Sequence, residues 1–289
     1  MRSFTLLSFL ALFLSAQTLP AQTRCATMDA QAQQLAQQPQ LHSAYQQAEH
    51  LASQFIANNP NYRGGVVIIP TVVHVVYNTS AQNISDAQVQ SQIDILNEDF
   101  RRMNADAVNT PSAFQSVAAD TDIEFCLANT DPNGNATDGI VRVSTSTSSF
   151  GTNDGVKFNS SGGSDAWPRD DYLNIWVCRM SGGILGYAQF PGGPASTDGV
   201  VVDYRYFGNI GTATSPFDLG RTSTHEVGHW LGLYHIWGDG GCGVDDNIND
   251  TPASDAANYG CSTNHSSCGS TDMVPVSYTH LTLPTNRCV

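Results

Sequence analysis

The segment HEVGHWLGLYH at residues 225–235 constrains the fold more than any other part of this 289-residue chain. His225 and His229 are four residues apart, so on a helix they share one face and can bind the same metal ion. Gly232 permits a sharp turn after the helix, because glycine adopts positive φ at little steric cost, and His235 can then return as a third ligand. The segment therefore predicts a helix, a tight turn and a returning histidine around one metal ion.

Three neutral imidazoles with a fourth position left open are typical of a catalytic zinc site and not of a structural one. Zinc lowers the pKa of a bound water from about 15.7 to about 7. Glu226 can take that proton as the water attacks a carbonyl, and can then pass it to the leaving amine. The alternative, a helix with solvated or core histidines, does not explain why Glu226, Gly232 and His235 stand where metal chemistry requires them.

The remaining histidines call for different interpretations. His74 lies in the apolar run VVIIPTVVHVVY, so we expect a hydrogen-bonded core histidine. His42 and His50 lie in a polar helical stretch and are expected to be solvated, and His265 lies in a loop without a ligand partner.

Composition and the first residues favour an exported protein. The chain has 26 acidic against 12 basic residues, a net charge of −14, which argues against nucleic acid and anionic membrane surfaces as partners. Residues 1–21 have a positive start, a short apolar core and a small-residue cleavage site, and therefore read as a secretory signal peptide. We expect a secreted protein, in which disulfides are permitted.

Hydrophobic patterns predict the order of elements. Residues 22–65 form a predicted pro-segment, helical over 25–59, before the β-branched strand 66–77. Ser85 begins a helix with Gln88 as a capping box. Its apolar residues recur at helical spacing and predict a core face: Val89, Ile93, Leu96 and Phe100.

Further strands are predicted at 122–128, 172–178 and 199–203, separated by loops, and the metal helix at about 218–231. The segment before the third of these strands, GYAQFPGGPASTD, reads as flexible. The order predicts an α+β fold in which the zinc helix lies beneath a mixed, twisted sheet.

Three segments together carry a family resemblance: HEVGHWLGLYH, GYAQFPGGPASTDGVVV and CGVDDNINDTP. With them the chain resembles the pappalysin (cytophagalysin) family of metzincin zinc peptidases over residues 66–273. The resemblance implies a metzincin catalytic domain at 66–274, with an upper subdomain built on a mixed sheet and a smaller, irregular lower one. It implies a zinc-dependent endopeptidase that acts on proteins or peptides, with Glu226 as general base and three zinc ligands: His225, His229 and His235.

Two further roles follow from the resemblance. The segment near Gly199 to Val202 matches the strand at the upper rim of the cleft, which would add an extended substrate as a strand; its alternative is an ordinary edge strand. Cys25 matches a pro-segment cysteine whose thiolate would occupy the fourth zinc position and keep a zymogen latent. The alternative for Cys25 is a structural or unpaired cysteine.

The loop after the motif resembles a calcium-binding loop, with hard oxygen ligands from Asp245, Asp246, Asp250 and Thr251. The alternative is a solvated acidic turn.

The cysteines allow two disulfide predictions. The resemblance pairs Cys242 with Cys268. Cys126 and Cys178 lie at similar places in two predicted strands and are candidates for a second bridge, although sequence alone does not fix the pairing. Cys261 would need a partner further downstream.

The last residues do not continue the resemblance. A metzincin has a tight methionine turn under the zinc, and Met273 matches a position just before that turn. Residues 276–285, VSYTHLTLPT, read as the translation of a transposase sequencing adapter, so we expect residues 275–289 to be non-biological and the lower subdomain to be truncated. Tyr278 and Cys288 then have no native role.

Two alternatives to an active peptidase remain at this point. One is a secreted adhesion or binding module with a vestigial zinc site, which the presence of Glu226 disfavours because a binding module needs no base. The other is an inactive, truncated fragment of the peptidase.

Overall fold

The computed structural model describes residues 25–59, 62, 64–110, 115–116, 118–248, 252–257 and 266–271. The predicted signal peptide and the predicted adapter segment lie outside these residues. Within them, no helix is both long and apolar enough to cross a membrane.

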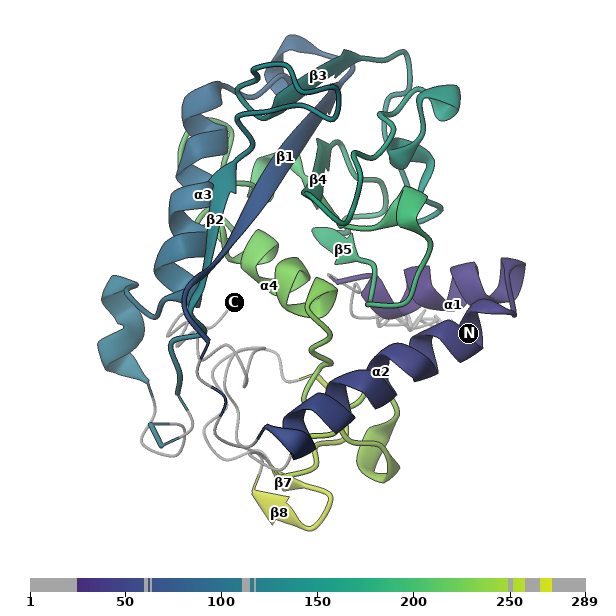
Figure 1. Ribbon diagram of the computed structural model, residues 1–289, viewed down its shortest axis with the longest axis vertical. Helices are drawn as coiled ribbons and strands as arrows, with labels where there is room; N and C mark the ends of the chain where they lie inside the picture. Colours follow the sequence, from purple (N-terminus) through teal and green to yellow (C-terminus); the bar gives the residue numbers. More distant parts are fainter. Residues whose placement is uncertain are drawn as a thin grey trace, which may run out of the picture.

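A mixed sheet forms the upper half of the molecule (Figure 1). Its strands follow in the order β2-β1-β4-β6-β5, and β3 also pairs with β1. All pairs are parallel except β5 with β6, which is antiparallel. The bounds are β1 Val67–Tyr77, β2 Ile123–Leu127, β3 Ile140–Ser144, β4 Leu173–Cys178, β5 Gly186–Ala188 and β6 Val200–Asp203. The predicted mixed sheet is confirmed, and the β-branched run forms its long strand β1.

The two faces of the sheet bury two separate cores, because successive side chains of a strand point to opposite faces. Val75 and Ile175 face the larger core, which α3 and α4 complete, whereas Val76 and Trp176 face the smaller one. Burial on both faces explains why β1 is apolar almost throughout and does not alternate.

Helix α3, Asp86–Phe100, begins as predicted at Ser85, whose side chain accepts a hydrogen bond from the backbone N–H of Gln88 at 3.2 Å. The reciprocal half of the capping box is absent in the described contacts. The Gln88 amide instead donates to the backbone oxygens of Tyr204 and Phe207, at 3.3 and 2.9 Å. The predicted core face is confirmed by the burial of Val89, Ile93, Leu96 and Phe100.

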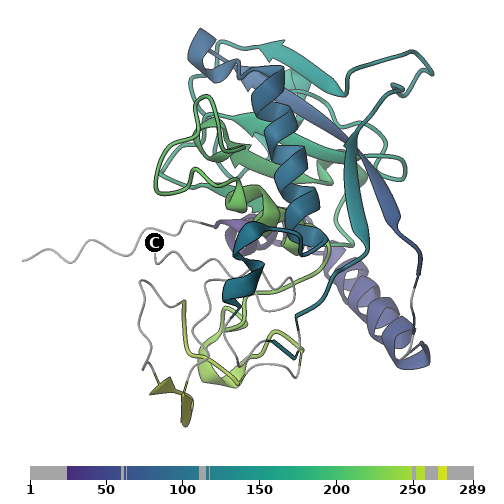
Figure 2. The same cartoon turned by 90° about the vertical axis from the view of Figure 1, so that its left-hand side faces the viewer.

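A stripe of buried polar residues on α3 positions the metal helix α4, Arg221–Trp230. The Gln92 amide donates to the Gly220 oxygen at 3.0 Å, and Asp99 accepts from Thr224 at 2.7 Å and pairs with Arg221 at 3.1 Å. Gly220, with φ of 69°, interrupts the helical conformation just before Arg221, which is why α4 begins later than predicted. Figure 2 shows α3 and α4 on the same side of the sheet.

The N-terminal segment forms two helices, α1 Thr27–Gln37 and α2 Leu41–Asn58, broken at residues 38–40, where proline removes a backbone donor. Figure 1 shows α2 crossing the lower half of the molecule and α1 at the right, next to β5. Ala26 and Ala30 belong to the smaller core, so the start of the segment is more deeply packed than its composition predicts. In α2 only Tyr45 is buried.

The structure corrects the identity of the edge strand. The predicted rim strand near Gly199 to Val202 corresponds to β6, which lies between β4 and β5 and is not an edge. The edge is β5, inside the segment that was predicted to be flexible. Strand β3 was also missed, in the Ser/Thr-rich region. Short 3-10 helices span Ser80–Gln82, Ala105–Asn109, Gly155–Lys157, Asn159–Ser161, Ala195–Thr197, Tyr204–Tyr206 and Gly241–Gly243.

The predicted Cys126–Cys178 bridge is wrong, and both cysteines are free. Cys126 is level with Pro70 of β1, whereas Val177 is level with Val75. Cys126 and Cys178 are therefore offset by about six residues, roughly 20 Å, and β1 stands between their strands. A disulfide needs Cα atoms within about 7 Å.

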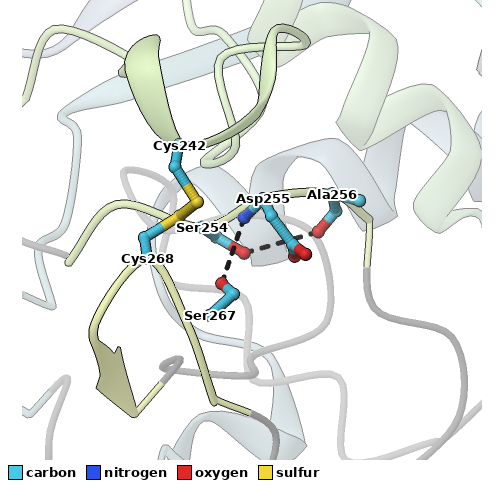
Figure 3. The surroundings of a disulfide bond; sticks show 6 residues. All are labelled: Cys242, Ser254, Asp255, Ala256, Ser267 and Cys268. Atoms are coloured by element: carbon cyan, nitrogen blue, oxygen red, sulfur yellow. Dashed lines mark hydrogen bonds between the residues drawn. A yellow bond between two sulfur atoms is a disulfide. The ribbon is translucent and has the colours of Figure 1, made fainter.

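Cys242 and Cys268 form a disulfide with a Cα–Cα distance of 5.2 Å (Figure 3). It joins the loop after the metal motif to the hairpin of β7, Ser266–Ser267, and β8, Ser270–Thr271. The Asp255 N–H donates to Ser267 Oγ at 3.1 Å beside it. Cys261 lies outside the described residues.

Candidate metal centre

Helix α4 and the turn after it bring the three predicted histidines together. His225 and His229 lie on one face of α4. The helix ends in a reversal in which the Gly232 N–H donates to the His229 oxygen at 2.8 Å and the Leu233 N–H to the Gly228 oxygen at 3.0 Å. Gly232 has φ of 99°, the left-handed conformation that the sequence required there. His235 then returns to the open side of the helix.

The three imidazoles point their Nε2 atoms at one place. The Nε2–Nε2 distances are 3.0 Å for His225 to His229, 3.2 Å for His229 to His235 and 3.4 Å for His235 to His225. Donors around a tetrahedral zinc ion, with bonds of about 2.0–2.3 Å, lie roughly 3.3–3.6 Å from one another. The donor set and its spacing therefore fit zinc.

Cys25 completes the donor set. Its Sγ and the donor nitrogens of His225, His229 and His235 all lie within 4.8 Å of one another. Among the described residues, these four side chains form the group of three or more that could hold a metal ion. Cys25 is brought there by a parallel bridge to Gly186 at the start of β5. Three imidazoles and a thiol are a soft, nitrogen- and sulfur-rich set, which zinc accepts.

The second ring nitrogens are held by the protein. His229 Nδ1 lies 2.5 Å from the Leu233 oxygen, and His235 Nδ1 lies 2.7 Å from Asp239 Oδ2. Such partners fix the ring orientation and leave Nε2 free for a metal. Sequence reasoning missed Asp239; the signal was an acidic residue four positions after a ligand histidine.

Glu226 lies beside the histidine cluster and is almost fully buried. Its Oε2 accepts from the Thr27 hydroxyl at 2.9 Å, and the Cys25 thiol lies 3.7 Å away. Thr27 Oγ1 in turn accepts from the Ala188 N–H of β5 at 2.9 Å. Thr27 therefore links the carboxylate to the edge strand, a contact that nothing in the motif predicted.

Gly186 is the reason that Glu226 can lie against β5. A Cβ at this glycine would be 2.8 Å from the Val201 oxygen and 2.9 Å from Glu226 Cγ, closer than real contacts allow. The absence of a side chain at Gly186 therefore permits both the pairing of β5 with β6 and the position of the carboxylate.

Burial dominates the electrostatics of the site. It raises the pKa of Glu226 to about 8, against the lowering effect of the hydrogen bonds from Thr27 and Cys25. Burial and the neighbouring imidazoles lower the pKa of His229 to about 3 and that of His225 well below its ordinary value. His225 and His229 are therefore neutral, the form that binds metal.

The candidate calcium loop is only partly described. Asp245 Oδ1 accepts from the Asp246 N–H at 2.9 Å, and Asp246 is buried, with Oδ1 accepting from the Ile248 N–H at 3.0 Å. Asp250 and Thr251 lie outside the described residues, so the calcium ligand set stays a prediction.

His74 lies away from this centre, as expected. It is fully buried, with Nδ1 2.8 Å from Ser164 Oγ and Nε2 3.0 Å from Asn174 Oδ1. Its ring stacks on Trp176 at 5.2 Å. The predicted hydrogen-bonded core histidine is confirmed.

A histidine-bearing helix beneath a mixed sheet, with the third ligand after a glycine turn, defines the zincin class of metallopeptidase folds. The family model described as "Pregnancy-associated plasma protein-A" matches residues 157–278. Mature mirolysin of Tannerella forsythia, solved in complex with a cleaved peptide, is 55% identical over 75% of this chain and 83% of its own, with a TM-score of 0.70. A promirolysin variant of Tannerella forsythia is 48% identical over 88% of this chain and 84% of its own, with a TM-score of 0.72.

An extracellular metalloprotease of Pyricularia oryzae is 34% identical over 71% of this chain, and the chain spans 64% of that relative's length. An extracellular metalloprotease of Podospora anserina is 41% identical over 34% of this chain and 35% of its own length. The chain belongs to the pappalysin family of metallopeptidases, a membership that implies a catalytic zinc.

Proposed function

We propose that this chain is a secreted zinc endopeptidase made as a latent precursor. The observation that carries the proposal is the convergence of three Nε2 atoms to within 3.4 Å of one another with a buried carboxylate, Glu226, beside them. A histidine-bound zinc ion supplies Lewis acidity, which polarises a carbonyl and acidifies water. His225, His229 and His235 would hold the ion.

Glu226 is the proposed proton carrier. Its Oε2 would take a proton from the attacking water and deliver it to the departing amine, a role that needs a carboxylate within hydrogen-bond reach of the reacting atoms. The free edge of β5 would bind the substrate backbone as an added strand. Support for this comes from the pro-segment, whose Ala26 N–H donates to the Gly186 oxygen at 3.1 Å on that edge.

The same contacts support latency. Cys25 stands at the fourth donor position, and Thr27 occupies Glu226 Oε2 and the Ala188 N–H. A substrate backbone would need all three places. The pro-segment therefore blocks the metal, the base and the edge strand at once, and must leave before catalysis.

The test is cleavage of casein and of a peptide library by the matured full chain and by Glu226→Gln. We expect the substitution to lower kcat/KM by about 10²–10⁴-fold with zinc still bound, since it removes only the proton carrier. Glu98→Gln, on the exposed side of α3, is the control. Equal activity of the wild type and Glu226→Gln would contradict the mechanism, and no cleavage by either would favour a binding module.

We further propose that Asp245, Asp246, Asp250 and Thr251 bind calcium. The support is the set of carboxylate and hydroxyl oxygens within one short loop, the hard donors that calcium prefers. Calcium should raise the Tm of the wild type and not of Asp246→Asn, and an equal rise in both would contradict this assignment.

A further inference from the structure

Two arginines meet at one end of the sheet, outside the metal centre. Arg179 directly follows β4 and Arg205 follows β6 by two residues, and β4 and β6 are parallel neighbours with Cys178 opposite Asp203. The carboxyl ends of adjacent parallel strands meet at the same edge of a sheet, where ligands commonly bind. Here they border a cavity of about 400 Å³ that also includes Leu185, Ser149, Ser181 and Tyr206.

The cavity is positively charged in a chain of net charge −14. No aspartate or glutamate belongs to its lining. Arg205 is held in place by Asp203, which is fully buried and binds Arg205 Nε at 2.9 Å and its terminal nitrogen at 3.0 Å. The remaining charge comes from Arg179, for which the described part of the chain provides no carboxylate within ion-pair distance. Other arginines do have such partners: Arg101, Arg142, Arg169 and Arg221.

The donors around the cavity suit a carboxylate. Arginine presents several N–H groups in a fixed plane that matches the two oxygens of a carboxylate. Ser149, Ser181 and Tyr206 add hydroxyl groups to the same lining, and Gly183 has φ of 76° in the turn that closes it. Arg205 is already oriented by Asp203, so little rotamer freedom would be lost there on binding.

The cavity lies in line with the edge strand that would bind substrate. Leu185, part of its lining, immediately precedes β5, and Gly186 is the residue that Cys25 bridges. An extended chain on this edge advances about 3.3 Å per residue, so it reaches the Gly182–Leu185 turn within two to four residues of the metal centre.

We propose that Arg179 and Arg205 form a carboxylate-binding subsite that receives an acidic side chain, or the terminal carboxylate, of the bound peptide two to four residues from the scissile bond. The subsite deepens the proposed peptidase function and rests on it for its biological ligand.

The first test compares cleavage of peptide pairs that carry Glu or Gln at each of these positions, and amidated against free C-termini. We expect kcat/KM for the peptide with the carboxylate to exceed kcat/KM for its neutral counterpart by roughly tenfold in at least one position. In Arg179→Met the ratio of these two kcat/KM values should fall close to one. Arg179→Lys should keep part of the preference. Arg142→Met is the charge-matched control, because Arg142 pairs with Asp86 outside the cavity, and should keep the full ratio. An unchanged ratio in Arg179→Met, or no preference in the wild type, would overturn the proposal.

A second measurement does not depend on catalysis. Phenylglyoxal modifies accessible arginines, and peptide mass spectrometry reports each site in the full chain. N-acetylglutamate at millimolar concentration should protect Arg179 several-fold more than it protects Arg142, and N-acetylglutamine should protect neither. Equal labelling of Arg179 with and without the carboxylate would overturn the subsite. Protection of Arg179 in a chain that cleaves no peptide would instead contradict the peptidase proposal alone.

Discussion

His74 is a buried imidazole whose charge state should govern stability in mild acid. Burial lowers its pKa to about 4, against the raising effect of the Asn174 hydrogen bond. A base with a depressed folded-state pKa contributes stability above its unfolded pKa of about 6.5, and this stability is lost as the pH falls toward 4. The difference between the unfolded and folded pKa values of His74 corresponds to about 3 kcal/mol of unfolding free energy.

The measurement is the free energy of unfolding between pH 4 and 7 for the wild type and His74→Phe. The variant keeps a ring against Trp176 but leaves Ser164 Oγ without its partner, so it should be less stable at pH 7 by about 1–3 kcal/mol. Its deficit should shrink as the pH falls. His50→Phe, at an exposed position, should follow the wild-type profile. A constant deficit across this range would show that His74 does not titrate as described.

Thr27 should contribute to latency in addition to Cys25. Thr27→Val keeps the shape but removes the hydroxyl that binds Glu226 Oε2 and the Ala188 N–H. The loss of two buried hydrogen bonds costs about 1–3 kcal/mol. The precursor should therefore cleave a fluorogenic peptide at least several-fold faster before maturation, and Thr27→Ser should behave like the wild type. Equal latency of Thr27→Val and wild type would assign the inhibition to Cys25 alone.

The histidine ligands were predictable because their spacing is local: one helical turn and one glycine turn place them. Thr27 and Gly186 were not, since their contacts with Glu226 join residues far apart in the chain, Thr27 and Glu226 by 199 positions. No periodicity or motif encodes such a distant contact. Asp239 is an intermediate case. A metal-bound histidine usually donates its second ring N–H to a carboxylate or a carbonyl, so Asp239 could be predicted once His235 was known to be a ligand.

Strand β5 is short, and its function depends on one glycine. Gly186→Ala would place a Cβ 2.8 Å from the Val201 oxygen and 2.9 Å from Glu226 Cγ. Because the Val201 oxygen is backbone, β5 or Glu226 must move, and a displacement of about 1 Å at a reacting group costs roughly a hundredfold in rate. We expect kcat/KM to fall by about ten- to a hundredfold while the protein remains folded.

Gly151→Ala is the control for this substitution, since a Cβ there meets only ordinary contacts, at 3.8 Å and beyond. Circular dichroism and Tm should separate misplacement of Glu226 from unfolding. Full activity of Gly186→Ala would mean that β5 tolerates a side chain and does not fix the carboxylate.

The elements that sequence predicted well are those with a strong apolar pattern. The β-branched run gave β1, and the apolar spacing of Val89, Ile93, Leu96 and Phe100 gave the core face of α3. β3 and β5 were missed because short strands at the margin of a sheet are defined by their partners. The pairing of β5 with β6 depends on a non-local register, and only this register shows which strand is the edge.

The N-terminal segment of the molecule covers its own histidine cluster and Glu226. Ala26 and Ala30 fill the smaller core, and Cys25 reaches the histidine cluster. Beyond α1, attachment weakens: α2 exposes Leu51, Phe55 and Ile56 at 51–69% of their surface. The segment is therefore held most firmly at its start, by the cluster and the edge of β5, with further contacts from Gln34 of α1 to Gln189 and from Tyr45 and Glu49 of α2.

Metal removal should release this segment before it unfolds the sheet. Chelation with 1,10-phenanthroline removes the ion to which Cys25 would bind. Helix α1 then keeps the Thr27 contacts, its buried alanines and the hydrogen bonds from Gln33 to Thr152 and from Gln34 to Gln189 and Thr197. Backbone amide exchange in α1 should then accelerate by at least about tenfold, the equivalent of 1.4 kcal/mol, because local opening costs less once an anchor is lost. Amides of β1 and α3, within the larger core, should change little.

Cys25→Ser provides the matched variant, since it removes the thiolate with zinc still present. Its α1 amides should exchange quickly without a chelator, and added zinc should not slow them. Addition of zinc to the chelated wild type should restore slow exchange. Equal acceleration of β1 and α1 on chelation would instead mean that the ion supports the entire fold. Slow exchange in Cys25→Ser would mean that the hydrogen bonds and apolar contacts of α1 hold the segment without the metal.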